Sequence, residues 1–265
     1  MSYTQVSIHP EARIAANVSI DPFTTIARDV EIGEGTWIGS NVTIYDGARI
    51  GRNCRIFPGA VISAVPQDLK YKGEETTTVI GDNTTIRECV TINKGTVAAG
   101  TTQVGKNCLL MAYVHIAHDC ILGDNVILAN SVNLAGHVTI EDWAILEGYV
   151  GVSQFIRIGA HSFIGGQTGV RKDVPPYVKA AREPLSYAGI NSVGLRRRGF
   201  DTNAIQEIQE MYRIIFQSGL IVTKAVDQIE SQLPPSPHRE HILGFIRNSE
   251  KGIMRGYTQL AAEED

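Results

Sequence analysis

The chain is poor in cysteine and has neither a long basic run nor a long apolar run. Its four cysteines form no paired motif and no secretory segment precedes them, so we expect a reducing cytosol rather than a disulfide framework. The net charge of −4 argues against a nucleic-acid-binding surface. Because no apolar stretch is long enough to span a bilayer, we expect no integral membrane segment.

The most prominent feature that the chain does contain is a six-residue repeat. From Ile8 to Val170, every sixth residue is Ile, Leu or Val, except at Asp68, Glu74 and Ala98. Helices and ordinary strands do not repeat at six, whereas a hexapeptide period is typical of a parallel β-helix. If three hexads form each coil, residues 18 apart stack at the interstrand spacing of about 4.8 Å.

Two further columns of residues support the β-helix. A small or β-branched side chain stands two residues before each aliphatic position, and three such positions are Cys54, Cys108 and Cys120, which we therefore expect in the core. One residue after the aliphatic position, small residues such as Gly33 and Gly51 are frequent. We expect tight turns there, often with positive φ.

The breaks in the repeat predict two loops, near residues 64–78 and 94–103, that leave the prism without changing its phase. Loops on a rigid scaffold often carry binding residues. After Val170 the repeat stops, and helical periodicity follows. We therefore expect a mainly β chain, with a β-helix over residues 1–182 and a C-terminal helical domain over residues 183–265. Open prism faces would favour self-association.

Capping residues predict three helices in the C-terminal part. The first is expected to begin at Asp201 or Thr202 and to run to about residue 218. The second is expected to be capped by Thr223 and to run to about residue 233. Ser236, followed by Pro237, is expected to open the third.

Stacking at 18 residues predicts a functional patch. Two residues after the inward Ile116, His118 is expected at the surface of the prism, with Asp119 beside it. Adding 18 to these positions reaches residues on the next two coils, namely Gly136, His137 and Gln154. Asp119 could hold one nitrogen of the His118 imidazole, leaving the other nitrogen to accept a proton.

The histidines also allow simpler interpretations. An exposed histidine on a solenoid is usually solvated, and we interpret four of them in this way: His9, His161, His238 and His241. Alternatively, the three imidazoles of His115, His118 and His137 could bind zinc, as histidines do in hexapeptide-repeat carbonic anhydrases. Against that alternative, His115 and His118 are two residues apart in a strand-like segment and are expected to point to opposite faces or edges.

Several motifs together carry a resemblance over essentially the whole chain: Gln67-Asp-Leu-Lys-Tyr, Asn93-Lys-Gly-Thr, His115-Ile-Ala-His-Asp-Cys, Leu134-Ala-Gly-His, Gln154-Phe, Asp173-Val-Pro-Pro-Tyr and Arg196-Arg-Arg-Gly-Phe. The chain resembles the hexapeptide-repeat acyltransferases, and among them the acyl-[acyl-carrier-protein]–UDP-N-acetylglucosamine O-acyltransferases. The resemblance implies a left-handed β-helix and a cytoplasmic homotrimer with active sites between subunits. It also implies transfer of an (R)-3-hydroxyacyl chain from acyl carrier protein to the 3-hydroxyl of UDP-N-acetylglucosamine, the first step of lipid A biosynthesis. That reaction needs neither a metal ion nor an organic cofactor.

The same resemblance implies roles for individual residues. His118 would be the general base, Asp119 would orient it, and the backbone N–H of Gly136 would stabilise the oxyanion. Residues matched to substrate binding are Gln67, Asp68, Lys70, His115, His137, Gln154, Gly166, Asn191, Arg197 and Arg198. Ser153 stands where the family commonly has histidine. A glycine at position 166, stacked on Gly148, suggests room for a long hydroxyacyl chain, such as tetradecanoyl.

Two other functions were considered. The sister N-acyltransferase, which acylates the glucosamine nitrogen, is expected to carry an extra N-terminal domain, whereas here the repeat already begins at Ile8. A structural or ice-binding solenoid is expected to show regular threonine ladders on one outward face. The outward positions of this repeat are irregular and are interrupted by two loops.

Overall fold

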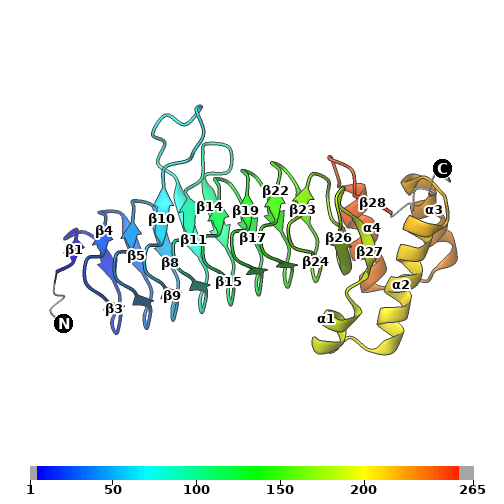
Figure 1. Ribbon diagram of the computed structural model, residues 1–265, viewed down its shortest axis with the longest axis horizontal. Helices are drawn as coiled ribbons and strands as arrows, with labels where there is room; N and C mark the ends of the chain where they lie inside the picture. Colours follow the sequence, from blue (N-terminus) through cyan, green and yellow to red (C-terminus); the bar gives the residue numbers. More distant parts are fainter. Residues whose placement is uncertain (1–4, 257–265) are drawn as a thin grey trace, which may run out of the picture.

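The computed structural model describes residues 5–256 and contains a three-sided parallel β-prism that ends in a cluster of helices (Figure 1). The domain ranges predicted from the sequence, 1–182 and 183–265, include residues 1–4 and 257–265, which lie outside the described residues. Within the described part, no helix is both long and apolar enough to cross a membrane.

Within residues 5–256 there are three sheets, here called A, B and C, made mostly of two-residue strands that pair in parallel; one pair at the C-terminal end of sheet C, Val178–Ala181 with Ser186–Ile190, is antiparallel. Sheet A contains β1 (Ser7–Ile8), β4 (Thr25–Ile26), β7 (Thr43–Ile44), β10 (Val61–Ala64), β13 (Thr91–Asn93), β16 (His115–Ile116), β19 (Asn133–Leu134), β22 (Gly151–Val152) and β25 (Gly169–Val170). Sheet B contains β2 (Arg13–Ile14), β5 (Val30–Ile32), β8 (Ala48–Ile50), β11 (Thr77–Ile80), β14 (Thr101–Val104), β17 (Ile121–Leu122), β20 (Thr139–Ile140) and β23 (Arg157–Ile158). Sheet C contains β3 (Ser19–Ile20), β6 (Trp37–Ile38), β9 (Arg55–Ile56), β12 (Thr85–Ile86), β15 (Leu109–Leu110), β18 (Ile127–Leu128), β21 (Ile145–Leu146), β24 (Phe163–Ile164), β26 (Val178–Ala181), β27 (Ser186–Ile190) and β28 (Arg255–Gly256).

The aliphatic column forms the core, as the period predicts. Residues 18 apart pair across neighbouring coils, for example Ile26 with Ile44, and both side chains are buried. Cys54, Cys108 and Cys120 are buried in the second inward column, in agreement with their prediction as core residues. Burial of these stacked side chains removes a continuous apolar surface from water, which no single coil could do.

The glycines that follow the aliphatic column act differently from the prediction. Gly33 and Gly51 do not have positive φ; instead, a Cβ on Gly33 would lie 2.6 Å from the backbone of Gly51, so the glycines permit close stacking of coils. The left-handed position comes three residues after the aliphatic residue, as at Asn41 (φ 57°) and Asn53 (φ 54°). Asparagine tolerates this conformation better than most side chains.

Both predicted loops leave the prism at the corner between sheets A and B. The first connects β10 to β11 through residues 65–76, and the second connects β13 to β14 through residues 94–100. Across the first loop Ile62 still pairs with Ile92, and across the second Ile80 still pairs with Val104. The loops therefore add whole hexads, and each inward residue stays inward.

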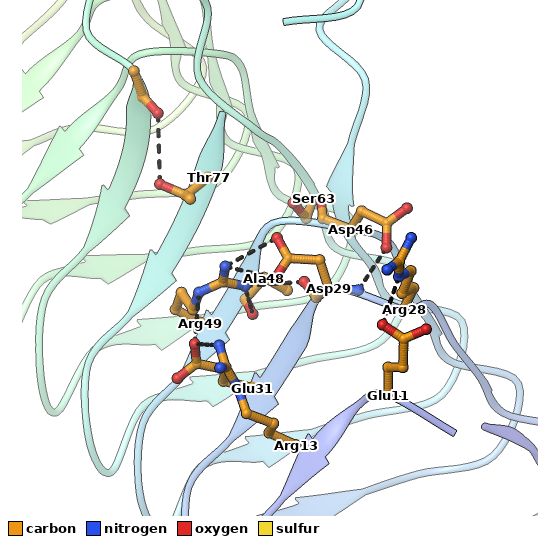
Figure 2. Close-up of polar contacts among 11 residues, drawn as sticks. Glu11, Arg13, Arg28, Asp29, Glu31, Asp46, Ala48, Arg49, Ser63 and Thr77 are labelled. Atoms are coloured by element: carbon orange, nitrogen blue, oxygen red, sulfur yellow. Dashed lines mark hydrogen bonds and ion pairs between the residues drawn. The ribbon is translucent and has the colours of Figure 1, made fainter. Parts of the chain in front are cut away.

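Opposite charges stack on the outer face of the first coils (Figure 2). Arg13, Glu31 and Arg49 are successive partners on sheet B, so that Glu31 forms ion pairs with both arginines. Arg49 also donates to both carboxylate oxygens of Asp29, at 2.7 and 2.9 Å. Such exposed pairs contribute little stability, about 0–1 kcal/mol each, but they fix the register of charges between coils.

Up to residue 256, where the described part of the chain ends, four helices follow the prism: α1 (Ser192–Arg197), α2 (Thr202–Gln217), α3 (Val222–Gln232) and α4 (Pro237–Arg247). The caps predicted at Asp201 and Ser236 are confirmed, since each side chain accepts a hydrogen bond from the first helical turn. The predicted cap at Thr223 is wrong: the N-cap of α3 is Ile221, two residues earlier, and it makes no side-chain capping hydrogen bond. Helix α1 was not predicted; its cap is Asn191, which accepts from the Gly194 amide.

Three histidines that were interpreted as solvated instead join the helices to the prism. His161 lies between Trp143 and Tyr177, with ring centroids 6.3 and 5.7 Å away. His241 on α4 lies 2.8 Å from the Tyr177 hydroxyl and 2.9 Å from Glu141. His238 also contacts the Tyr177 ring. Only His9 is exposed, as predicted.

Replacing His161 with phenylalanine is expected to make the fold less sensitive to acid. Burial, followed by nearby positive charge on Arg198, lowers the pKa of His161 to about 4 from an ordinary value of 6.5. Between these two pH values His161 is protonated in the unfolded chain but not in the folded one. Protonation therefore favours unfolding, and the free energy of unfolding decreases as pH falls from 6.5 to 4.

Thermal melting at pH 7.5, 5.5 and 4.5 tests this expectation. The Tm of the His161→Phe variant should rise relative to that of the wild type as the pH falls from 6.5 towards 4. The exposed His9→Gln variant is the control and should track the wild type. A Tm difference for His161→Phe that is the same at all three pH values would contradict the prediction.

Candidate active site

A groove of about 600 Å³ runs along sheet A, next to the A–B corner of the middle coils. Its lining contains many of the predicted site residues and several others: Gln67, His115, Ala117, His118, Asn133, Leu134, Ala135, Gly136, Gly151, Val152, Ser153, Gln154, Gly169 and Arg171. The groove is therefore built mainly by three consecutive coils, as the 18-residue stacking predicts.

His118 and Asp119 form a hydrogen-bonded pair at the centre of this corner. His118 Nδ1 lies 2.8 Å from Asp119 Oδ2, and the two residues are only 4% and 3% exposed. An ionised carboxylate can only accept, so Nδ1 carries the proton and Nε2 keeps its lone pair. Although it lies outside the prism core, His118 is thus covered rather than surface-exposed as expected, because neighbouring coils and loops close over it.

The pKa of Asp119 is set by opposing effects. Burial raises the pKa, but hydrogen bonds from Thr96 and His118 outweigh it and hold the pKa below its usual value. Asp119 therefore stays ionised at neutral pH. An ionised partner is what a neighbouring imidazole needs in order to stabilise its protonated form during proton transfer.

Gly136 stacks directly on the His118 ring. A Cβ placed on Gly136 would lie 2.6 Å from His118 Cε1 and 2.7 Å from Nε2, closer than real side chains approach. Within residues 5–256 the amide of Gly136 donates no hydrogen bond, so that it is available to a ligand. The structure therefore brings the imidazole and this amide to the same place.

His137 and His115 flank the pair. His137 Nε2 lies 3.7 Å from Asp119 Oδ2, and its ring stacks on Phe155 at 4.6 Å. His115 lies on β16, 2.7 Å from the Thr91 hydroxyl, and burial lowers its pKa. His115 lines the same groove as His118, so the expectation that they point apart is wrong. The chain turns the corner after Ile116, which returns His118 to the side of sheet A.

The first loop reaches over the groove. Gln67 lines it, and Asp68 Oδ2 lies 4.0 Å from His118 Nε2. Lys70 is exposed, and its backbone amide donates to Asp68 Oδ1 at 2.9 Å, which fixes the turn of the loop. Leu69 beside it is fully exposed.

Seven of the ten predicted binding residues do not line this groove in the single chain: Asp68, Lys70 and His137, which lie beside the groove or on the first loop, and the four described next. Gly166 lies beyond it, with Gly148 beneath. Asn191 caps α1 and donates to the His161 carbonyl at 2.9 Å. Arg197 is exposed on α1, and Arg198 lies over the Trp143 ring at 5.0 Å. Figure 1 shows α1 at the C-terminal end of the prism, away from β17 and β19.

Two other features resemble binding sites: a cluster of possible metal ligands and a second groove. His118, Asp119 and His137 offer ligand atoms within 4.8 Å of one another and could hold a metal ion. The Asp119 carboxylate, however, already accepts hydrogen bonds from Thr96, Ala99 and His118. A larger groove of about 840 Å³ adjoins the charged ladder of Figure 2 and the end of the first loop. Its arginines are paired with acids, and it contains no histidine next to a carboxylate.

The fold, with its six-residue repeat, is that of the hexapeptide-repeat transferases. The family model described as bacterial transferase hexapeptide matches residues 29–64 and 101–136, and the model described as UDP-N-acetylglucosamine O-acyltransferase, domain 2, matches residues 173–254. The chain belongs to the family of acyl-[acyl-carrier-protein]–UDP-N-acetylglucosamine O-acyltransferases.

Relatives and solved structures support this assignment. The enzyme of that name from Paracidovorax citrulli is 47% identical over 73% of this chain and 76% of its own. The one from an Anaeromyxobacter species is 40% identical over 74% and 76%. The crystal structure of the UDP-N-acetylglucosamine acyltransferase from Bacteroides fragilis superposes with a TM-score of 0.95 at 52% identity, covering 96% and 100%. That from Francisella novicida has a TM-score of 0.94 at 42% identity, covering 100% and 99%. The predicted left-handed parallel β-helix with C-terminal helices is confirmed.

The signals that were missed lie mainly in the loops. Thr96 contacts Asp119 through both its amide and its hydroxyl, whereas in the sequence it stands out only as part of the Asn93-Lys-Gly-Thr motif. Thr91 holds His115 and is 24 residues away, rather than 18, because the second loop intervenes. The break in the six-residue repeat at Ala98 is the one sequence signal that points to the contact between the second loop and Asp119.

Proposed function

We propose that the protein transfers an (R)-3-hydroxyacyl chain from acyl carrier protein to the 3-hydroxyl of UDP-N-acetylglucosamine, the step that begins lipid A biosynthesis. The observation that carries the proposal is the His118–Asp119 pair, with Gly136 stacked on the free imidazole nitrogen. The family assignment favours this O-acyl transfer over N-acyl transfer, a metal-dependent hydration or a purely structural solenoid.

In the proposed mechanism His118 Nε2 accepts the proton of the sugar 3-hydroxyl as that oxygen attacks the thioester carbonyl. The carbonyl oxygen becomes an oxyanion, to which the Gly136 N–H donates. When the oxyanion collapses and the carbon–sulfur bond breaks, the thiolate of the carrier protein takes this proton from the imidazolium and leaves as the thiol, which returns His118 to its neutral form. Asp119 stabilises the imidazolium and keeps its ring in one orientation. Every step uses groups of the chain itself.

The binding roles follow the arrangement of the groove. We assign Asp68, Gln67, His115, His137 and Gln154 to the sugar and the pyrophosphate, because they surround the base or line the groove. Lys70 extends from the first loop and would reach the acyl donor.

Asn191, Arg197 and Arg198 are assigned to the nucleotide, since the arginine fork matches phosphate geometry. Because α1 is remote from His118 within one chain, these residues would come from a neighbouring subunit. We therefore propose a homotrimer with active sites between subunits. The four free cysteines support a cytosolic location.

An assay with purified protein, UDP-N-acetylglucosamine and 3-hydroxyacyl carrier protein tests the function. An acylated UDP-sugar should form, and mild alkali should release the acyl chain because it is bound as an ester. A product resistant to alkali would indicate N-acylation. Absence of any acylated sugar with all donor lengths from ten to sixteen carbons would overturn the proposal.

Replacing Gly166 with methionine is expected to shift the preferred donor to a shorter acyl chain. A Cβ on Gly166 would lie 3.1 Å from the Gly148 carbonyl oxygen, so a longer side chain must extend along the surface where two glycines leave room. Each methylene that loses its apolar contact costs about 0.8 kcal/mol. We therefore expect kcat/KM for a fourteen-carbon donor to fall at least about tenfold relative to a ten-carbon donor.

Thin-layer assays across donor lengths measure this shift. Gly244→Met on α4 is the control, because a Cβ there meets nothing within 4 Å. It should leave the chain-length preference unchanged. A wild type that already prefers ten carbons, together with an unaltered Gly166→Met variant, would show that this glycine does not set acyl length.

A further inference from the structure

The second loop, residues 94–100, forms a cradle around the Asp119 carboxylate. The amides of Thr96 and Ala99 donate to Asp119 Oδ1 at 2.9 and 3.3 Å. The Thr96 hydroxyl lies 2.6 Å from Asp119 Oδ2. This loop belongs to the coil that precedes His118, so the cradle approaches the carboxylate from the side opposite Gly136 and His137.

The hydrogen-bond pattern defines which atom donates. The Thr96 hydroxyl oxygen accepts from the Ala98 amide at 3.2 Å, so its own hydrogen is directed to the carboxylate. Together with the His118 Nδ1–H, Oδ2 then accepts two hydrogen bonds and Oδ1 accepts two. A carboxylate with four donors is both ionised and fixed in rotation.

The cradle is itself rigidly anchored. Thr96 is buried, and the Gly95 beside it is held on both sides: its amide donates to the Thr77 carbonyl, and its carbonyl accepts from the Thr76 hydroxyl. The backbone amide of Asp119 donates to the Thr102 hydroxyl at 2.8 Å. The orientation of the carboxylate is therefore set before any substrate binds.

We propose that Thr96 is a positioning residue for catalysis, whose hydroxyl holds Asp119 so that His118 presents Nε2, unprotonated, to the acceptor hydroxyl. The proposal rests on the proposed function, in which His118 is the base. Thr96 touches neither substrate nor reacting atoms; it acts through Asp119. This role explains the break of the six-residue period at Ala98. The inserted hexad supplies hydrogen-bond donors to the Asp119 carboxylate that a regular coil lacks.

The Thr96→Val variant tests the proposal because it removes only the hydroxyl and keeps the shape and the backbone amide. Loss of a hydrogen bond to a charged group should lower kcat roughly tenfold, with KM for the sugar nucleotide changed less than about twofold. Thr96→Ser restores the hydroxyl and should recover most of the activity. Thr84→Val is the matched control: Thr84 is buried and its hydroxyl bonds only to backbone atoms of the prism, Gly105 and Cys108.

The pH profile separates positioning from mere stability. Three titratable side chains lie next to the His118–Asp119 pair or within it. His118 and His137 lie next to the Asp119 carboxylate, and Asp68 lies next to the His118 ring. Without the threonine donor, the carboxylate binds protons more tightly and stabilises the imidazolium more strongly. The acid limb of kcat/KM should therefore move to higher pH in Thr96→Val and stay in place in Thr84→Val.

Two further measurements test whether Thr96 acts through Asp119 and separate the role of Thr96 from the proposed function. In an Asp119→Ala background, adding Thr96→Val should cause no further loss; an additive loss would overturn the proposal. ¹⁵N NMR of the His118 ring at one fixed pH should show different nitrogen shifts in Thr96→Val and in the wild type, whether or not acyl transfer is seen. Unchanged nitrogen shifts together with an unmoved acid limb would overturn the role of Thr96 alone, whereas an inactive wild type would overturn the proposed function.

Discussion

The His118→Ala variant is expected to lose about 10²–10⁴-fold in kcat, the usual contribution of a positioned general base. The imidazole is nine-tenths or more buried and is held at 2.8 Å by Asp119. The second imidazole beside this carboxylate, that of His137, has its Nε2 3.7 Å from Asp119 Oδ2 and stacks on Phe155.

Steady-state kinetics with UDP-N-acetylglucosamine and a saturating hydroxyacyl donor measure the loss. The fold should persist, because His118 lies outside the aliphatic core of the prism. His9→Ala, at an exposed position on the first coils, is the control and should retain full activity. A His118→Ala protein that turns over near the wild-type rate would rule out this imidazole as the base.

The Gly136→Ala variant is expected to lose about 100-fold in kcat/KM, because displacement of a catalytic group by about 1 Å has effects of that size. The added methyl would stand 2.6 Å from His118 Cε1, so one of the two must move. The imidazole cannot simply rotate away, since its Nδ1 is bonded to a carboxylate that is fixed by the second loop. The methyl would also crowd the amide proposed to bind the oxyanion.

A double variant distinguishes a steric effect on His118 from a general disturbance. If alanine at 136 acts by displacing the base, Gly136→Ala should add little to the loss already caused by His118→Ala. Gly244→Ala, where a Cβ meets nothing within 4 Å, controls for the effect of alanine on the chain. Full activity in Gly136→Ala would mean that the close approach of coil and imidazole has no role in catalysis.

Much of the fold was predictable because a solenoid converts sequence spacing directly into spatial spacing. Ile8, Ile14 and Ile20 begin the inward positions of sheets A, B and C, and every later inward residue follows from them; the stacked pairs follow wherever no loop intervenes. The helix starts at Asp201 and Ser236 were also predictable, since a cap is a local interaction within three residues. The start of α3 was not, because it has no cap and packing of its apolar side chains determines where it begins.

The positions of three histidines show the limit of local reasoning. His161, His238 and His241 lie on the prism and on α4, far apart in sequence, and they meet only around Tyr177. Their spacing does not resemble any motif, and each alone looks like an exposed polar residue. Contacts between a repeat and a non-repeating segment have no period from which to be inferred.

The sequence by itself determined the prism, its three faces, the corners where loops leave it, and the stacking of His118 under Gly136. It could do so because each of these depends on a spacing of six or 18 residues along the chain. Only the tertiary structure decided that the second loop folds back onto Asp119, that His115 shares the groove with His118, and that α1 lies remote from both. Those contacts depend on the path of inserted or terminal segments, whose direction is set by hydrogen bonds and packing rather than by the repeat.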